Sequence, residues 1–469
     1  MTQHTPVSEP GTKTQRASTS TRHISPPGPR ENRLLGGSAR IIQRDPLGFN
    51  MSMFERYGNV VRVHFLIWPT YMVFHPQDVK HVLQENHRNY SKDTYLIHFL
   101  RPLLGNGLFS NDGQSWLHQR RLMQPAFHRK QLATFGRMMT GATESMLERW
   151  QHASSLNQSL DVAQEMMQLT LQIVGQALFS IDLSDETDTV GQAFTALMAP
   201  LMDYIFNPVP PLGFPTPRNR RIQQHIRTLD GVVQTIITEH RQRDADKDDL
   251  LSTLLAARDE ETGEQMNDRQ LRDEIMTLLL AGHETTANAL TWTWYLLSQH
   301  PEAESLLHAE LEQVLGGRIP TVEDLPRLTY TRMVLEETLR LYPPAVGFNR
   351  KAMADDEVGG YFIPAGTLIW LSPYTTHRHP EFWEKPDVFD PERFSQERSA
   401  GRPHFAHFPF GGGPRLCIGN HFAMMEAQLV LATIAQHYRL RLVPDHKVEP
   451  QALLTLRPRG GLPMMLVQT

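Results

Sequence analysis

The chain has 469 residues, a formal net charge of −5 and a single cysteine. One cysteine excludes an internal disulfide, and a chain of this length can bury a large core without one. The slightly negative charge excludes a global basic surface of the kind that binds nucleic acid. No apolar run approaches the roughly 18 residues that cross a bilayer, since the longest, Met276–Gly282, is short. We therefore expect a soluble, cytoplasmic protein without a membrane anchor.

Residues 1–40 differ in composition from the remainder. They contain six Lys/Arg against two acidic residues, many Ser and Thr, and the turn-rich run Pro26–Pro29. Such a composition predicts a disordered N-terminal arm. An Arg- and Ser-rich organelle transit peptide is the alternative, whereas a secretory signal would need an apolar segment that these residues lack.

Beyond Asp45 the residue pattern is mainly helical. Two short strands are expected at 59–65 and 70–74, around a turn at Pro69. The proline-rich run Asn207–Pro215 predicts a loop, either a mobile cover over a ligand site or a plain connection. The periodicity of apolar residues predicts helices at roughly 76–86, 115–124, 129–151, 161–180, 186–204 and 218–243.

A long helix is predicted from about Asn267 to His300. Asn267 and Gln270 resemble a capping box at its start, and Pro301 ends it. About thirty residues at a rise of 1.5 Å each would cross the whole protein, so this helix should be central and buried. The segment from Pro343 to Phe410 is rich in turns and short strands.

The most informative stretch is Phe408–Asn420, F-P-F-G-G-G-P-R-L-C-I-G-N. We expect Cys417 at the start of a final helix that runs to about His437, where backbone N–H groups and the helix dipole favour a thiolate. Three consecutive glycines allow the backbone to approach a flat ligand. Phe410 could cover the sulfur, and Gly419 leaves room for a macrocycle. Taken alone, the cysteine could also be an inert core residue or a protease nucleophile.

Within that stretch Phe410, Gly413, Arg415, Cys417 and Gly419 complete the pattern F-x-x-G-x-R-x-C-x-G. This spacing resembles the heme-binding loop of the cytochrome P450 family. The resemblance implies heme b (iron protoporphyrin IX) as the cofactor. It also implies that Cys417 is the metal ligand, the axial thiolate of the iron.

A second motif, Ala281–Thr286, places polar residues inside the apolar long helix. Polar side chains in such a position cost free energy unless they have partners, and a threonine hydroxyl can bond back to the helix and open a groove. A satisfied polar notch would explain the residues equally well. The run resembles the family's oxygen-activation motif, A-G-x-[D/E]-T-[T/S]. The resemblance implies that Glu284 and Thr285 support proton delivery, while His283 and Thr286 are structural.

A third motif is Glu337-Thr-Leu-Arg340, an acid and a base on one helix face. Surface helices contain many such pairs, so the spacing alone says little. Its place in the chain resembles the family's E-x-x-R motif, with Arg393 as the third member. The resemblance implies a buried ion network beneath the cysteine loop, with a structural role.

Trp116 and Arg120 are four residues apart on a predicted short helix and therefore face the same way. An ordinary amphipathic helix would show the same spacing. The pair resembles the family's W-x-x-x-R motif, which binds a heme propionate, and Arg350 and Arg415 match further propionate-binding positions. Several cations are chemically reasonable, because two buried carboxylates need more than one.

The resemblance covers residues 41–469 and implies one domain, which replaces the roughly three domains suggested by length. The fold class is mainly α with a small β region. The cytochrome P450 fold implied here has a long central helix over a heme and a Cys-loop beneath it.

The resemblance implies a heme-thiolate monooxygenase that uses O2 and two electrons to insert one oxygen atom into its substrate. We expect a ferredoxin and its reductase, or a flavodoxin, as separate electron donors, because the 52 residues after Cys417 contain no flavin or iron–sulfur segment. Arg121, Arg129 and Lys130 are candidates for a basic docking face. A heme-thiolate isomerase, dehydratase or peroxygenase, and a non-enzymatic heme sensor or electron carrier, are the alternatives. They have less reason to keep the Glu284-Thr285 pair.

The stretches expected to line the substrate pocket are largely apolar. They predict a lipophilic substrate such as a fatty acid, terpenoid, steroid or carotenoid. These stretches are Tyr95–Leu104, Met198–Phe214, Leu278–Ala281, Ala345–Phe348 and Leu453–Leu456.

Overall fold

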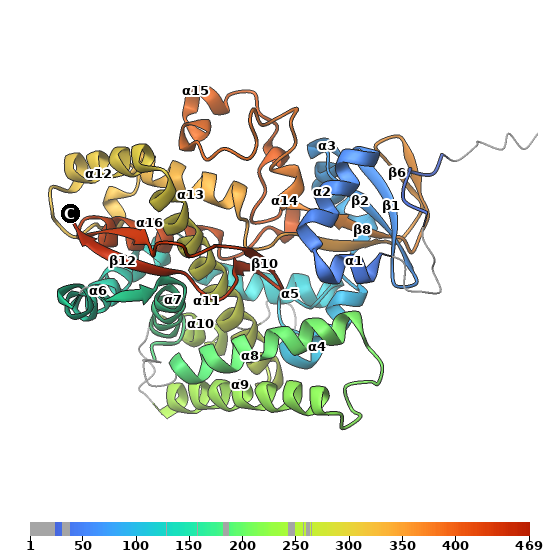
Figure 1. Cartoon of the computed structure of the whole chain (residues 1–469). Coiled ribbons are helices and arrows are strands. Elements are labelled where there is room, and N and C mark those ends of the chain that lie inside the picture. Colours follow the sequence, from blue (N-terminus) through green and yellow to red (C-terminus); the bar gives the residue numbers. More distant parts are fainter. Residues whose placement is uncertain are drawn as a thin grey trace, which may run out of the picture.

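The computed structural model describes residues 24–30, 38–127, 129–156, 158–181, 187–242, 249–256, 258, 263 and 265–469. In this part of the chain a mainly helical body carries a small β region at one end (Figure 1). The fold class expected from the sequence is therefore confirmed. No helix among the described residues is long and apolar enough to cross a membrane.

Helices form most of the described structure, and those predicted between residues 76 and 243 are present as α3 and α5 to α9. The first of them continues beyond Lys80 as a π-helical turn, His81–Glu85. The periodicity did not reveal α4, which contains an internal proline, Pro102. The helices are α1 (Ala39–Arg44), α2 (Pro46–Tyr57), α3 (Pro76–Lys80), α4 (Tyr95–Leu104), α5 (Gly113–Met123), α6 (Arg129–Ser155), α7 (Val162–Phe179), α8 (Thr187–Phe206), α9 (Pro217–Gln242), α10 (Leu250–Ala256), α11 (Asp268–Gln299), α12 (Pro301–Leu315), α13 (Thr329–Leu341), α14 (Pro373–Thr376), α15 (Gln396–Ser399) and α16 (Asn420–Ala435).

The strands form one five-stranded sheet and three smaller sheets. The largest has the order β1-β2-β8-β5-β3, and a three-stranded sheet has the order β4-β12-β9. The strands are β1 (Val60–Phe65), β2 (Trp68–Val73), β3 (Tyr90–Ser91), β4 (Ser159–Asp161), β5 (Phe348–Ala352), β6 (Asp356–Val358), β7 (Tyr361–Ile363), β8 (Leu368–Leu371), β9 (Tyr438–Leu442), β10 (Pro450–Ala452), β11 (Leu456–Pro458) and β12 (Pro463–Gln468).

The first hairpin, β1–β2, turns at Leu66 and Ile67, because Phe65 pairs with Trp68. The predicted turn at Pro69 is wrong, since Pro69 lies inside β2. The proline is tolerated there because pairing of β2 with β8 begins only at the next residue, Thr70.

Part of the N-terminal segment lies against the sheets. The N–H of Arg62 donates to the carbonyl of Pro27 (2.8 Å), and the N–H of Phe362 donates to the carbonyl of Ile24 (3.0 Å). Residues 1–23 and 31–37 lie outside the described residues, so for them the disordered arm stays a prediction.

The long helix α11 runs through the centre of the molecule (Figure 1). Asn267 caps its start by accepting the N–H of Gln270 (2.9 Å), as the sequence predicted. It packs against α7, α9, α13 and α16, so most of its central residues are buried. A helix enclosed in this way is a rigid wall for any adjacent cavity.

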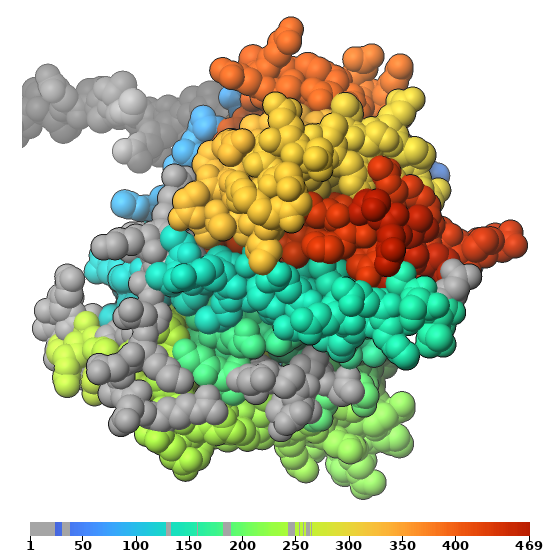
Figure 2. All heavy atoms as spheres, turned by 90° about the vertical axis from the view of Figure 1, so that its left-hand side faces the viewer, coloured from blue at the N-terminus to red at the C-terminus, as the bar shows by residue number. Residues whose placement is uncertain are grey.

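The C-terminal strands β9 and β12 cover the helical body between α12 and α6. In Figure 2 the C-terminal segment (red) lies between the yellow residues around α12 and the teal residues around α6. Glu304 of α12 pairs with Arg439 (3.0 Å) and Arg441 (2.6 Å) of β9, which fixes this sheet to the helical body.

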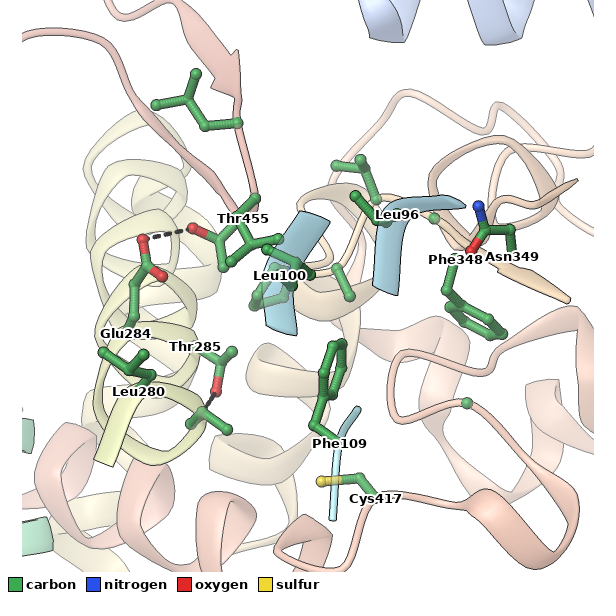
Figure 3. Close-up of a pocket in the computed structure, with 18 of the residues that line it drawn as sticks. Leu96, Leu100, Phe109, Leu280, Glu284, Thr285, Phe348, Asn349, Cys417 and Thr455 are labelled. Atoms are coloured by element: carbon green, nitrogen blue, oxygen red, sulfur yellow. Dashed lines mark hydrogen bonds between the residues drawn. The ribbon is translucent and has the colours of Figure 1, made fainter. Parts of the chain in front are cut away.

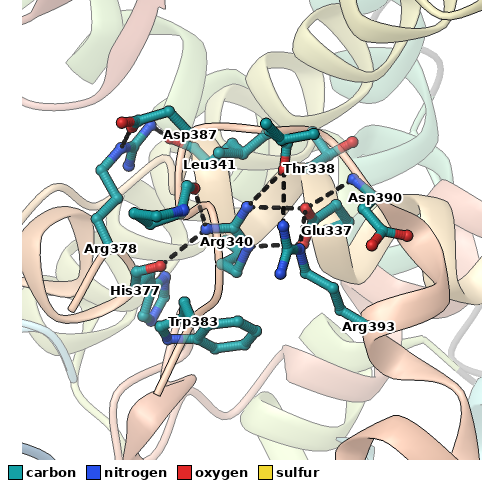
Figure 4. A network of polar contacts seen from close by, with 12 residues as sticks. Glu337, Thr338, Arg340, Leu341, His377, Arg378, Trp383, Asp387, Asp390 and Arg393 are labelled. Carbon is teal, nitrogen blue, oxygen red and sulfur yellow. Dashed lines mark hydrogen bonds and ion pairs between the residues drawn. The ribbon is translucent and has the colours of Figure 1, made fainter. Parts of the chain in front are cut away.

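A buried ion network lies at the end of α13 (Figure 4). The side chains of Arg340 and Glu337 are both 0% exposed and form two hydrogen bonds, of 2.6 and 2.8 Å. Arg393 is 3.4 Å from the same carboxylate. Arg340 also donates to the carbonyls of His377 (2.9 Å) and Pro386 (2.6 Å), so one guanidinium joins α13 to the segment that precedes the cysteine loop.

That segment in turn holds the start of the cysteine loop. The ring of His377 accepts the N–H of Phe408 through Nε2 (2.9 Å), and the indole of Trp383 donates to the carbonyl of Ala406 (3.3 Å). The guanidinium of Arg340 lies 5.0 Å from the Trp383 ring. The network therefore supports the loop from beneath.

Replacing Arg340 with Ala should strongly destabilise the protein. It leaves the Glu337 carboxylate buried beside only one remaining arginine, and breaking a buried pair costs about 3–5 kcal/mol. Arg332 is the matched control on the same helix, since it pairs with Glu336 at 3.1 Å but is 48% exposed. R332A should cost less than about 1 kcal/mol. Urea unfolding followed by circular dichroism measures both, and equal effects would contradict a structural role for the network.

Candidate active site

A cavity of about 730 Å³ lies between α11, the five-stranded sheet and the cysteine loop (Figure 3). Most side chains around it are apolar. All nine residues predicted as catalytic or cofactor-binding line this one cavity, although they come from distant parts of the chain. They are Trp116, Arg120, Glu284, Thr285, Arg350, Phe410, Arg415, Cys417 and Gly419.

The cysteine loop forms one wall of the cavity. Its turn is closed by two backbone bonds, from the N–H of Gly411 to the carbonyl of Phe408 (2.9 Å) and from the N–H of Cys417 to the carbonyl of Phe410 (3.0 Å). Helix α16 begins at Asn420, so the prediction that it begins at Cys417 is wrong. A turn at residues 418–419 intervenes and frees the N–H of Gly419 to point at the sulfur.

Two of the three consecutive glycines serve the packing of the loop. Gly413 has φ +66°, and a Cβ there would lie 1.8 Å from the carbonyl oxygen of Leu83 in the π-helical turn. A Cβ on Gly412 would lie 2.3 Å from the Phe405 ring. These two glycines thus make room for protein neighbours, whereas Gly411 of the same run lines the cavity. Open space is found instead at Gly419, where a Cβ would meet only the Phe127 ring, at 4.0 Å.

The thiol of Cys417 is exposed to the cavity but enclosed by the protein. Burial raises its pKa, whereas a hydrogen bond from the Gly419 N–H and the charge of Arg120 lower it. A metal cation above the sulfur would complete the stabilisation of a thiolate that these two groups begin.

Arginines gather on the wall beside the loop. Arg120 donates to the carbonyl of Leu416 (3.0 Å), and the guanidinium of Arg415 stacks on the Trp116 ring at 4.0 Å. Arg350 is buried in β5. Burial lowers the pKa of Arg350 and of Arg415 to about 10, and repulsion by Arg415 contributes to the shift of Arg350.

Lys92 joins this cationic cluster and was missed by the sequence analysis. Burial and the charges of Arg350 and Arg415 lower its pKa well below the ordinary value. Its ammonium donates to the carbonyl of Phe109 and lies 4.1 Å from that ring. No local pattern marks Lys92, because only the fold brings β3 beside β5.

The cluster carries more positive charge than its protein partners neutralise. Asp112, which pairs with Arg415, is the one carboxylate that lowers the cost of these cations among the described residues. A ligand with two carboxylates would complete the balance. With the thiol and the open space at Gly419, this charge distribution fits heme b and its two propionates.

On the α11 side, Thr285 and Glu284 present different groups to the cavity (Figure 3). The Thr285 hydroxyl donates to the carbonyl of Ala281 (2.7 Å). Glu284 is 2% exposed and accepts a hydrogen bond from the Thr455 hydroxyl (2.7 Å). Burial raises the pKa of Glu284 to about 7, against the opposing effects of Thr455 and Arg457. A carboxyl with this pKa can both hold and release a proton near neutral pH.

Most predicted pocket stretches line the cavity, with one exception. Helix α8 contributes only as far as Phe206, and the loop at residues 207–216 does not line it. Asn219 of α9 holds this loop by donating to the carbonyls of Pro211 (2.8 Å) and Phe214 (2.9 Å). The geometry favours the plain connection over the mobile cover. Phe109, which the analysis missed, lines the cavity above Cys417 (Figure 3).

Comparison with known proteins agrees with this geometry. A family model described as Cytochrome P450 matches residues 26–462. The chain belongs to the cytochrome P450 family. It is 38% identical to cyclooctatin synthase of Streptomyces melanosporofaciens over 93% of this chain and 94% of that protein. It is 37% identical to pentalenene oxygenase of Streptomyces avermitilis over 90% of this chain and 92% of that protein.

Comparison with solved structures leads to the same family. The crystal structure of the cytochrome P450DA heme domain matches with a TM-score of 0.86 and 27% identity, over 95% of this chain and 98% of that one. The chain is thus a P450 monooxygenase with heme b as its cofactor, and it requires O2, an organic substrate and a redox partner.

Replacing Gly413 with Ala should impair heme retention by this P450. The new Cβ would collide with the Leu83 carbonyl and push the cysteine loop away from its support. Gly401 is the control, since it has φ +79° with nothing within 4 Å of a Cβ. G401A should cost only the left-handed backbone strain, about 1–2 kcal/mol. The ratio of heme to protein after purification measures the difference, and full heme content in G413A would refute it.

Proposed function

We propose that this P450 inserts one oxygen atom of O2 into a cyclic terpenoid hydrocarbon, with Cys417 as the axial thiolate. The observation that carries the proposal is the cavity of about 730 Å³ against Cys417, whose lining is overwhelmingly apolar. Such a lining favours a hydrocarbon skeleton over an ionic substrate. A further similar protein, 38% identical over 87% of this chain and 88% of its own length, is cyclooctat-9-en-7-ol 5-monooxygenase of Streptomyces melanosporofaciens. Its name and that of pentalenene oxygenase point to a ring alcohol and a hydrocarbon as the substrates of those proteins.

The residues on the Cys417 side would hold the cofactor. Cys417 would bind the iron, while Arg120, Arg350 and Arg415, with Trp116, would bind the propionates. When bound, heme supplies the iron chemistry that activates O2, and a thiolate ligand favours cleavage of the O–O bond. Lys92 would add a further cation beside the propionates, Asp112 would offset part of the positive charge, and Gly419 leaves the space for the flat ring. Phe410 would shield the sulfur from water.

The residues on the α11 side would handle protons. Thr285, in the wall that faces Cys417, would accept a hydrogen bond from the reaction space through its hydroxyl oxygen, because its one hydroxyl hydrogen is donated to Ala281, and Glu284 would supply protons from its buried carboxyl. Phe109 would limit how the substrate lies above Cys417. Because all three occupy the cavity that encloses the thiol, they would act on a substrate held away from bulk water.

A ferredoxin with its reductase would deliver the two electrons. A hollow of about 490 Å³ adjoins the main cavity at Cys417 and is lined in part by Arg120, Gln124 and His421. Arg121 is exposed on the adjacent helix α5. Positive groups near the shortest path to the thiol favour an acidic carrier. The side chains of Arg129 and Lys130 lie outside the described residues.

The substrate class can be tested by spectral titration. Cyclic terpenoid hydrocarbons should shift the Soret band of the heme-loaded protein, because an apolar ligand that fills the cavity displaces water from it. Addition of NADPH, ferredoxin and reductase should then yield a product with one added oxygen atom. Fatty acids and carotenoids form the comparison set. Binding and oxidation of these, but of no terpenoid, would refute the proposal.

Replacing Thr285 with Ala should separate electron use from product formation. Loss of the positioned hydroxyl, which holds a hydrogen bond in the reaction space during proton delivery, should lower product per NADPH at least about tenfold, while heme content stays unchanged. Thr291 is the matched control, because it is buried on the same helix and donates only to the carbonyl of Ala287 (2.7 Å). T291A should couple normally. Unchanged coupling in T285A would exclude the role given to Thr285.

A further inference from the structure

Glu284 is the end of a line of three hydrogen-bonded side chains. The amide Nδ2 of Asn288 donates to the hydroxyl of Thr455 (3.2 Å), and that hydroxyl donates to Oε1 of Glu284 (2.7 Å). The three residues are 2%, 7% and 2% exposed, respectively. Asn288 and Glu284 are one turn apart on α11, whereas Thr455 comes from the turn between β10 and β11. The line exists only because the C-terminal hairpin packs against α11.

The chemistry of these groups fixes the direction of the line. An amide nitrogen only donates, so the Thr455 oxygen must accept from Asn288. The single hydroxyl hydrogen of Thr455 is then available for Glu284 alone. Oε1 must therefore be an acceptor, and a proton carried by the carboxyl must reside on Oε2. The line thus selects one oxygen of Glu284 as the one that takes up and releases a proton.

We propose that Thr455 is a positioning residue for this P450: it ties Oε1 of Glu284 to the β10–β11 turn and leaves Oε2 as the proton-transferring atom. The inference rests on the proton-supplying role proposed for Glu284. Without the hydroxyl, the carboxyl would lose its fixed orientation and a bond that stabilises its ionised form. Glu284 would then stay protonated to higher pH.

After burial, the hydrogen bond from Thr455 has the largest effect on the pKa of Glu284. Arg457 of β11 is the charged group that attracts the carboxylate. His283, on the same helix, is held neutral by burial, which lowers its pKa to about 4. Glu426 of α16 interacts with Thr286, and burial raises its pKa well above the ordinary value, so it also stays neutral. Neither group would mask a change at Glu284.

The test is a pH titration of Glu284 by difference infrared spectroscopy on the resting, heme-loaded protein without substrate or reductant. The carbonyl stretch of the protonated carboxyl is assigned by its loss in E284Q. In the wild type it should disappear as the pH rises through about 7. Loss of a hydrogen bond to a charged group is worth about one to two pKa units, so in T455V the band should persist to that much higher pH.

Three further variants make the test specific. T455S keeps the hydroxyl and should restore the wild-type titration. T291V removes a buried hydroxyl from α11 that has no contact with Glu284, and should titrate as the wild type does. T455A provides a second deletion of the hydroxyl should the bulkier valine disturb folding. In turnover, the alkaline limit of product coupling should move upward in T455V and T455A, in parallel with the infrared titration.

A Glu284 band that titrates at the wild-type pH in both T455V and T455A would overturn the inference. So would failure of T455S to restore the wild-type titration. Because the infrared measurement needs no substrate, its outcome is independent of whether terpenoids are oxidised. A failed search for terpenoid products would count against the proposed function and leave the role of Thr455 standing.

Discussion

Arg340 carries a positive charge that solvent does not reach, and the structure beneath Cys417 is arranged to compensate for it. Glu337 supplies the opposite charge from the same helix, and backbone carbonyls of the following segment accept the remaining N–H groups. Uncompensated burial of such a charge would cost several kcal/mol, so these bonds allow the segment little freedom. His377, held within it, fixes the first residue of the cysteine loop. The position of the thiol is thus set by electrostatics as well as by apolar packing.

Around the cavity, in contrast, protein groups neutralise the positive charge only in part. Arg350 is buried and the half-buried Lys92 and Arg415 lie close to it, with Asp112 as their shared anion, and repulsion within the cluster lowers the pKa of Lys92 and of Arg350. In the proposed arrangement Lys92, Arg350 and Arg415 would repel one another less, because two propionates would lie among them. This relief would add to the free energy with which heme binds, beyond the contribution of the iron–sulfur bond. Because heme would bind the folded chain only, a higher affinity would also raise the free energy of unfolding. One ion network is complete in the protein alone, and the other is complete only with its ligand.

The sequence was sufficient where function depends on short spacing along the chain. The pattern around Cys417, the pair Glu284-Thr285 and the capped start of α11 are local, and each lies where its motif predicted a site or an element. Lys92 could not be found in this way, and neither could the bond from Thr455 to Glu284, although Thr455 lies in the predicted pocket stretch Leu453–Leu456. Both residues act through neighbours more than a hundred residues away, which only the packing of strands against helices brings together.

Predictions from short sequence patterns were also wrong where one residue type, glycine or proline, is compatible with two structural roles. The glycines of the cysteine loop suggested space for a ligand, yet Gly412 and Gly413 mainly avoid collisions with Phe405 and Leu83. The turn expected at Pro69 was misplaced because the end of a strand also tolerates proline. In both cases the residue alone does not reveal which neighbour it accommodates, since that neighbour is fixed only by tertiary packing.

The anchored loop between α8 and α9 limits how the end of α8, which lines the cavity, can move. Asn219 is fully buried and bonds to backbone carbonyls of this loop, so the loop cannot swing open as a hinged flap without abandoning several bonds at once. On the inner side, the Tyr95 hydroxyl ties α4 to the end of α8 through the carbonyl of Ile205 (2.6 Å). Any widening of the cavity at the α8 end therefore requires α4, α8 and the loop to shift together, which makes such a movement a property of helix packing rather than of loop flexibility.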